Sequence, residues 1–210
     1  MTFKGIDVSS IQGHIDWQSV KNAGYDFAVI KCYNGNANID PLCITNLHGA
    51  QTVGLKTALY NVIYPLPADA AHPNRDPVSQ AILHLSVSLS ANNNKPIFTF
   101  ADIEWPDPND WPKWNVNAQF ISDWIMQYLT TYSSHGGNVG CYIYPYYAKL
   151  LNLPQQITQY PLWIASYQAT AAIPHPWTSY YMWQSSGGTH TLPNGVPVDI
   201  DETEDMSLLV

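Results

Sequence analysis

Charged side chains are scarce in this chain. They make up 11 % of its 210 residues, where soluble domains average about 25 %, so uncharged polar residues must cover much of the surface. Cations are fewer than anions, with 8 Lys and Arg against 16 Asp and Glu, and the net charge is −8. We therefore expect no binding to nucleic acid or to an anionic membrane surface, because both require clustered cations.

Cysteines and long apolar runs are also few. The three cysteines, Cys32, Cys43 and Cys141, are odd in number and lack metal-ligand spacing, so we expect free thiols in a chain made in a reducing compartment. The seven histidines likewise show no ligand spacing. We expect no metal and no cofactor. No stretch reaches the roughly 18 apolar residues of a membrane span, so we expect no membrane insertion.

Aromatic residues are abundant instead. Hydrophobic residues form 46 % of the chain and aromatic residues 13 %, including 8 Trp and 14 Tyr. This composition is typical of a folded globular protein, and flat amphipathic rings suit a groove for sugars. The chain has no linker, repeat or low-complexity segment. We therefore predict one domain over residues 1–210, large enough to bury a single core.

The pattern of apolar residues and turn signals predicts a β/α alternation that stops before the end of the chain. Five strand–helix units are followed by three strands with few helices between them. The expected strands are 3–9, 27–33, 56–64, 96–104, 138–144, 162–167, 181–184 and 198–201. The expected helices are 17–23, 42–53, one from residue 76, 116–132 and 147–151. Alternation of this kind predicts a parallel sheet, and here an α/β fold closed as an irregular TIM-like barrel.

The fourth strand ends in two acids. Asp102 and Glu104 are two residues apart, so both side chains point to the same face of the strand. Two carboxyls in one space disfavour joint ionisation, which raises the pKa of one of them. A protonated acid beside an ionised partner is what hydrolysis of a glycoside uses. Alone, the pair is weak evidence, because an Asp-x-Glu at an exposed strand end is more often a solvated loop.

Other acids fall at the same end of the expected barrel. In a parallel barrel, reactive groups gather where the strands end. We expect Asp7 at the end of the first strand, Asp102 and Glu104 at the end of the fourth, and Asp199 at the end of the last. Acids far apart in sequence that meet at one barrel mouth favour an active site over solvated loop charges.

The opening of the chain, Gly5-Ile-Asp-Val-Ser-Ser-Ile-Gln-Gly-His-Ile-Asp-Trp17, resembles the first motif of the family 25 glycoside hydrolases. These are muramidase lysozymes that often occur as phage endolysins. The resemblance implies an irregular β/α barrel and cleavage of the β-1,4 bond after N-acetylmuramic acid in peptidoglycan. Further matches follow in order along essentially the whole chain: residues 50–55, Asp102-Ile-Glu104, Leu162-Trp-Ile-Ala-Ser-Tyr167, Trp183-Gln184 and Val198-Asp-Ile-Asp201.

The resemblance also implies roles for individual residues. Glu104 falls on the general acid and Asp102 on its strand partner, while Asp7 and Asp199 fall on two further acids of the site. The predicted substrate-binding residues are Tyr60, Tyr144, Trp163, Tyr167, Trp183 and Gln184. The implied partner is the glycan strand of peptidoglycan, bound by a monomer.

Two positions depart from the family pattern. Asn34 stands where an acid is usual, and Asp201 stands where Asn is usual. Neither removes a principal catalytic position. The spacing of Asp102 and Glu104 leaves retaining, inverting and substrate-assisted routes open. A glycan-binding barrel without catalysis and a chitinase-like glycosidase are the alternative functions.

The N-terminal residues contain neither a charged leader followed by an apolar run nor a cleavage site. We therefore expect a protein without a signal peptide, made in the cytoplasm, that acts on the cell wall. It would reach the wall as a phage lysin released by a separate route or as part of a virion.

Overall fold

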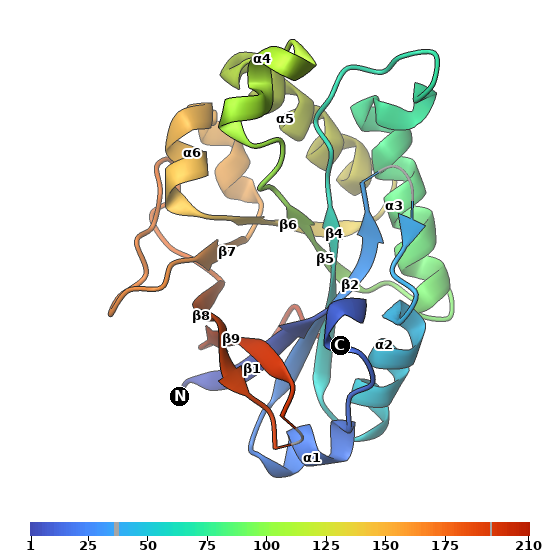
Figure 1. Cartoon of the computed structure of the whole chain (residues 1–210), viewed down its shortest axis with the longest axis vertical. Helices are drawn as coiled ribbons and strands as arrows, with labels where there is room; N and C mark the ends of the chain where they lie inside the picture. Colours follow the sequence, from blue (N-terminus) through green and yellow to red (C-terminus); the bar gives the residue numbers. More distant parts are fainter. Residues whose placement is uncertain (36–37, 194) are drawn as a thin grey trace.

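The computed structural model describes residues 1–35, 38–193 and 195–210. Its strands close into a barrel (Figure 1). Eight strands form the ring, because β1 pairs with both β2 and β9. Around the ring they are β1 (Phe3–Val8), β2 (Phe27–Asn34), β4 (Lys56–Val62), β5 (Phe98–Asp102), β6 (Asn138–Ile143), β7 (Leu162–Ala165), β8 (Met182–Thr191) and β9 (Pro197–Thr203). A short β3 (Asn38–Ile39) pairs antiparallel with the end of β2.

The helices lie outside the strands (Figure 1). They are α1 (Trp17–Asn22), α2 (Cys43–Thr52), α3 (Pro77–Ala91), the single-turn α4 (Trp111–Trp114), α5 (Ala118–Ser134) and α6 (Pro145–Leu151). Side chains that cap backbone N–H groups fix where several begin: Asp16, Asp76 and Asn117 accept from the backbone of the first turns of α1, α3 and α5. No α-helix follows α6 in the described residues. The predicted irregular barrel of five β/α units and three further strands is confirmed.

The expectation that all strands run parallel is wrong for β9. This strand is antiparallel to both β8 and β1. The reason is the short connection from β8, where the backbone N–H of Leu192 donates to the carbonyl of Val196 at 2.8 Å. A parallel crossover needs a dozen residues or more, whereas a tight turn reverses the chain. Because β9 is reversed, its first residues lie at the end of the barrel where the parallel strands finish, and its last residues lie where those strands begin.

Apolar side chains fill the barrel at the end where the parallel strands begin. Phe27, Phe98 and Met182, near the starts of their strands, are buried inside it with Leu209 of the C-terminal tail. The last residue, Val210, exchanges two backbone hydrogen bonds with Thr57 at the start of β4. The tail therefore covers the end of the barrel where the parallel strands begin. The other end, where these strands finish, remains accessible.

Two further clusters of buried residues pack between the strands and the surrounding helices. Cys32 and Cys43 lie in one and Cys141 in the other, and all three thiols are free and buried. Among the described residues, no helix is long and apolar enough to cross a membrane.

Candidate active site

A pocket of about 250 Å³ opens at the end of the barrel where the parallel strands finish. It brings together the four predicted acids with aromatic rings and one amide. The lining residues are Asp7, Tyr60, Asp102, Glu104, Tyr142, Trp163, Tyr167, Gln184 and Asp199. These residues come from β1, β4, β5, β6, β7, β8 and β9 or the segments just after them, so the site exists only in the closed barrel.

Strand alternation places Asp7 and Asp199 at the mouth. On β1, Ile6 and Val8 pack outward beneath the helices, so Asp7 points inward. Asp7 is directly opposite Asp199 in the antiparallel pair of β1 and β9. Asp199 is the third residue of β9, near the start of that strand rather than its end. It reaches the mouth only because β9 is reversed.

Asp102 and Glu104 occupy different depths of the pocket. Asp102 is the last residue of β5 and is 4 % exposed, and its Oδ1 has no hydrogen-bond partner among the residues that the structure describes. The backbone N–H of Ile103 still donates to the carbonyl of Tyr142 at 2.9 Å, which keeps the chain extended beyond the strand. Glu104 therefore follows on the same face, with its side chain exposed at the rim.

Both carboxyls of this pair favour the protonated form. Burial raises the pKa of Asp102 well above its ordinary value, and the neighbouring Glu104 adds to the rise. Loss of solvent around its carboxyl also raises the pKa of Glu104. The ammonium of Lys31 opposes both shifts. It lies 5.9 Å from the ring centre of Tyr60, at a position that sequence reasoning did not assign to the site.

The second pair of acids has the same tendency. Burial and the charge of Asp199 raise the pKa of Asp7 to about 7, against the effect of hydrogen bonds with Gln184 and Asp201. Burial raises the pKa of Asp199 as well, although the backbone N–H of Gly188 donates to its carboxylate. The pocket therefore holds acids that keep protons at higher pH than free carboxyls do.

The amide of Gln184 joins three walls of the pocket. Its Nε2 donates to Oδ2 of Asp7 at 2.7 Å, and its Oε1 accepts from the hydroxyls of Tyr142 at 2.9 Å and Tyr167 at 2.7 Å. These bonds fix which way the amide faces and hold Asp7 in place. Tyr142 was not predicted from sequence. Its position on β6, two residues before Tyr144, was the available signal.

Two predicted substrate-binding residues do not line the pocket. Trp183 precedes Gln184 and therefore points out of the barrel, where its Nε1 donates to the carbonyl of Ser166 at 2.7 Å. Tyr144 lies just past β6 and stacks on Tyr147, with ring centres 5.6 Å apart. Burial and the nearby Glu104 raise the pKa of Tyr144, so its ring lies beside the rim.

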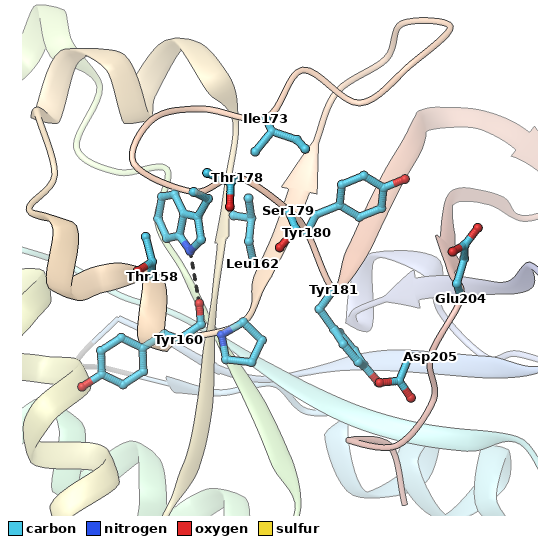
Figure 2. A pocket seen from close by; sticks show the side chains of 12 residues that line it. Thr158, Tyr160, Leu162, Ile173, Thr178, Ser179, Tyr180, Tyr181, Glu204 and Asp205 are labelled. Atoms are coloured by element: carbon cyan, nitrogen blue, oxygen red, sulfur yellow. Dashed lines mark hydrogen bonds between the residues drawn. The ribbon is translucent and has the colours of Figure 1, made fainter.

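A larger cavity of about 630 Å³ lies at the opposite end, by the starts of β7 and β8 and the end of β9 (Figure 2). Its wall is built partly by Trp177, whose Nε1 donates to the carbonyl of Tyr160 at 3.2 Å. Of its two acids, Asp205 already accepts from the backbone and hydroxyl of Ser207. Opposed buried carboxyls do not occur among its lining residues. We therefore take the smaller pocket as the candidate active site.

Clustered carboxyls among aromatic rings at a barrel mouth are typical of enzymes that act on carbohydrates. The sequence profile of the glycosyl hydrolases family 25 matches residues 6–191. The chain belongs to this family.

Two lysozymes match this chain in sequence, one over most of its length and one over a short stretch. The autolytic lysozyme of Clostridium acetobutylicum is 26 % identical over 200 residues, 93 % of this chain and 55 % of the relative. Lysozyme M1 of Streptomyces globisporus is 40 % identical over 62 residues, 30 % of this chain and 21 % of the relative. The chain thus spans about half of the first relative and about a fifth of the second.

Solved structures share the fold. The bacterial lysozyme from Streptomyces coelicolor gives a TM-score of 0.79 at 22 % identity, covering 98 % of this chain and 93 % of that one. The muramidase from Trichobolus zukalii gives 0.79 at 20 % identity, covering 97 % and 94 %. The autolysin LytC from Streptococcus pneumoniae, solved with a synthetic peptidoglycan ligand, gives 0.76 at 18 % identity, covering 96 % and 46 %.

Proposed function

We propose that the chain is a muramidase that cleaves the β-1,4 bond between N-acetylmuramic acid and N-acetylglucosamine in peptidoglycan. The observation that carries this proposal is the pocket in which Asp102 and Glu104 face Asp7 and Asp199, with raised pKa values in all four carboxyls. A carboxyl that keeps its proton near neutral pH can protonate a leaving glycosidic oxygen. Membership of family 25 and likeness to lysozymes support the choice of substrate.

In this proposal Glu104 is the proton donor. It stands at the exposed rim, where the leaving sugar is accessible, and the partial loss of solvent around its carboxyl raises its pKa and so favours the protonated form. Asp102 lies deeper, and its unpartnered Oδ1 is free to accept a hydrogen bond from the substrate. The N–H of a 2-acetamido group suits that atom, so we favour a route in which Asp102 orients the acetamido oxygen as an internal nucleophile.

The remaining pocket residues bind and orient the sugar. The ring of Tyr167 is 60 % exposed while its hydroxyl is tied to Gln184, so the ring face is available to stack on a sugar. Trp163 is fully buried below, with its ring centre 4.5 Å from that of Tyr142. The Trp163 ring forms the floor of the pocket.

The bond that is cut can be identified from the fragments of purified peptidoglycan. Reduction with borohydride tags the sugar that carries each new reducing end. A muramidase gives muramitol after acid hydrolysis, and mass spectrometry of the fragments confirms intact disaccharides. Glucosaminitol as the main product would identify a glucosaminidase and contradict the proposal. If the protein binds glycan but produces no new reducing ends, it is a glycan-binding protein without catalytic activity.

We also propose that the protein acts as a monomer and that its site of action is the bacterial cell wall. Light scattering at working concentration tests the first statement. Clearing of a suspension of isolated walls tests the second, with a suspension of chitin as the control substrate for a chitinase-like activity.

A further inference from the structure

Below the pocket lies a fifth acid, Asp201, in an unusual environment. It follows Asp199 by two residues on β9 and points into the barrel one level deeper, opposite Gly5 of β1. Its side chain is completely buried. Oδ1 accepts a hydrogen bond from Nε1 of Trp163 at 2.8 Å. Asp201 is also the diagonal neighbour of Asp7 on the same face of the paired strands, which brings the two carboxyls within reach of each other.

A hydrogen bond between two carboxyls requires a proton on one of them, because a carboxylate only accepts. No cation is paired with Asp201: the side-chain ion pairs of the described residues join Asp69 to His72 and Arg75, far along the chain. A fully buried and unpaired carboxylate is very costly. One of the two acids must therefore stay neutral.

The donors around the pair decide which acid that is. Asp7 accepts from Nε2 of Gln184 at 2.7 Å and can also accept from Asp201, and it lies at the mouth, where solvent enters. Among the described residues, Asp201 accepts from Trp163 alone, and none of them donates to its Oδ2. A negative charge is thus better stabilised on Asp7.

We propose that Asp201 is a neutral carboxylic acid and a positioning residue, whose O–H donates to Asp7 and makes Asp7 the member of the pair that ionises. Burial and the charge of Asp7 raise the pKa of Asp201 well above its ordinary value, which agrees with this arrangement. The same hydrogen bond acts to lower the pKa of Asp7. The effect on turnover rests on the proposed glycosidase function, while the protonation state does not.

An Asn side chain in place of Asp201 would present an N–H to Asp7, and a protonated Asp presents an O–H with nearly the same shape. An ionised Asp201 would instead repel Asp7. Other titratable groups that face the pair are Asp199 on β9, Glu104 after β5, Tyr60 on β4, Tyr142 on β6 and Tyr167 after β7.

Infrared spectroscopy tests the protonation state without any substrate. A protonated carboxyl has a C=O stretching band separate from the carboxylate bands. At pH 8.5 the wild-type spectrum minus that of Asp201→Asn should contain this band, whereas the wild-type spectrum minus that of Asp199→Asn should not. A carboxylate band in place of the carboxyl band in the Asp201→Asn difference would overturn the proposal.

The pH profile of turnover tests the positioning role. Asp201→Asn keeps a donor to Asp7, so turnover should stay within about threefold of wild type, with an unshifted profile. Asp201→Ala removes the donor, so the limb governed by Asp7 should move upward by about one pH unit. A folded Asp201→Asn protein that loses turnover as fully as Asp201→Ala would show that the acid is needed as an anion. Absence of glycan cleavage in the wild type would refute the enzyme function and leave the infrared result standing.

Discussion

The variant Asp7→Asn is expected to be more stable than the wild-type protein at neutral pH while losing most of its activity. Burial and Asp199 raise the pKa of Asp7 from 3.8 to about 7 in the folded protein. Below pH 3.8 the carboxyl is protonated in both the folded and the unfolded state. Between pH 3.8 and 7 the unfolded chain loses this proton and the folded protein keeps it, so the contribution of Asp7 to stability falls as the pH rises.

The size of the effect follows from the pKa shift. A rise of about three units at roughly 1.36 kcal/mol per unit corresponds to about 4 kcal/mol of unfolding free energy between pH 3.8 and pH 7. Asn at this position has no proton to release, and its Oδ1 can still accept from the Gln184 amide. The difference in unfolding free energy between variant and wild type should therefore grow by about 4 kcal/mol over this range and then level off.

Urea unfolding of both proteins at a series of pH values measures this difference. Other titrating groups are common to both proteins, so their contributions largely cancel in the subtraction. Asp123→Asn on α5, where the carboxylate is exposed and accepts from Gln119, controls for the substitution itself. A difference between Asp7→Asn and wild type that does not change with pH would refute the claim that Asp7 is held against its preferred charge.

Further predictions concern the proton donor, a buried histidine and the cysteines. Glu104→Gln should lower wall clearing by about 100-fold or more while the protein still folds; near-normal clearing would assign the donor to another acid. Burial lowers the pKa of His84 to about 4, so the stability that it contributes is present above pH 6.5 and is lost as the pH falls through 4; His84→Gln should flatten this acid limb in urea unfolding. Replacing each of the three buried cysteines by Ser should preserve activity, and inactivation by dithiothreitol would contradict free thiols.

Much of the site could be predicted because strands impose a simple rule. Side chains alternate along a strand, and parallel strands of a barrel finish at one end. Asp7 and Asp102 both stand at the ends of apolar strands, and the structure places both in one pocket. Tyr60 and Trp163 come to the same place from β4 and β7. Local sequence was sufficient for these residues because each strand was recognisable by itself.

Other features depend on contacts that no local pattern contains. Lys31 lies on β2 among apolar residues, and only the closed barrel brings its charge close enough to Asp102 and Glu104 to lower their pKa values. Trp183 and Gln184 are neighbours in sequence, but alternation sends one into the helical shell and the other into the pocket. Because neighbouring side chains on a strand point to opposite faces, Trp183 and Gln184 cannot both face the substrate.

The reversal of β9 has the widest consequence for the chemistry of the site. In a parallel strand, Asp199 would lie at the end of the barrel that the C-terminal tail covers, far from Asp7. The tight turn after β8 reverses the strand, so Asp199 faces Asp7 at the mouth and Asp201 lies one level below it. Asp7 is thereby placed between Asp199, which lies near solvent, and Asp201, which lies in the dry interior. The charge of Asp199 raises the free-energy cost of ionising Asp7, whereas Asp201, by keeping its own proton, lowers that cost. The direction of β9 thus decides which acids surround Asp7 and so contributes to the charge that the pocket offers to a substrate.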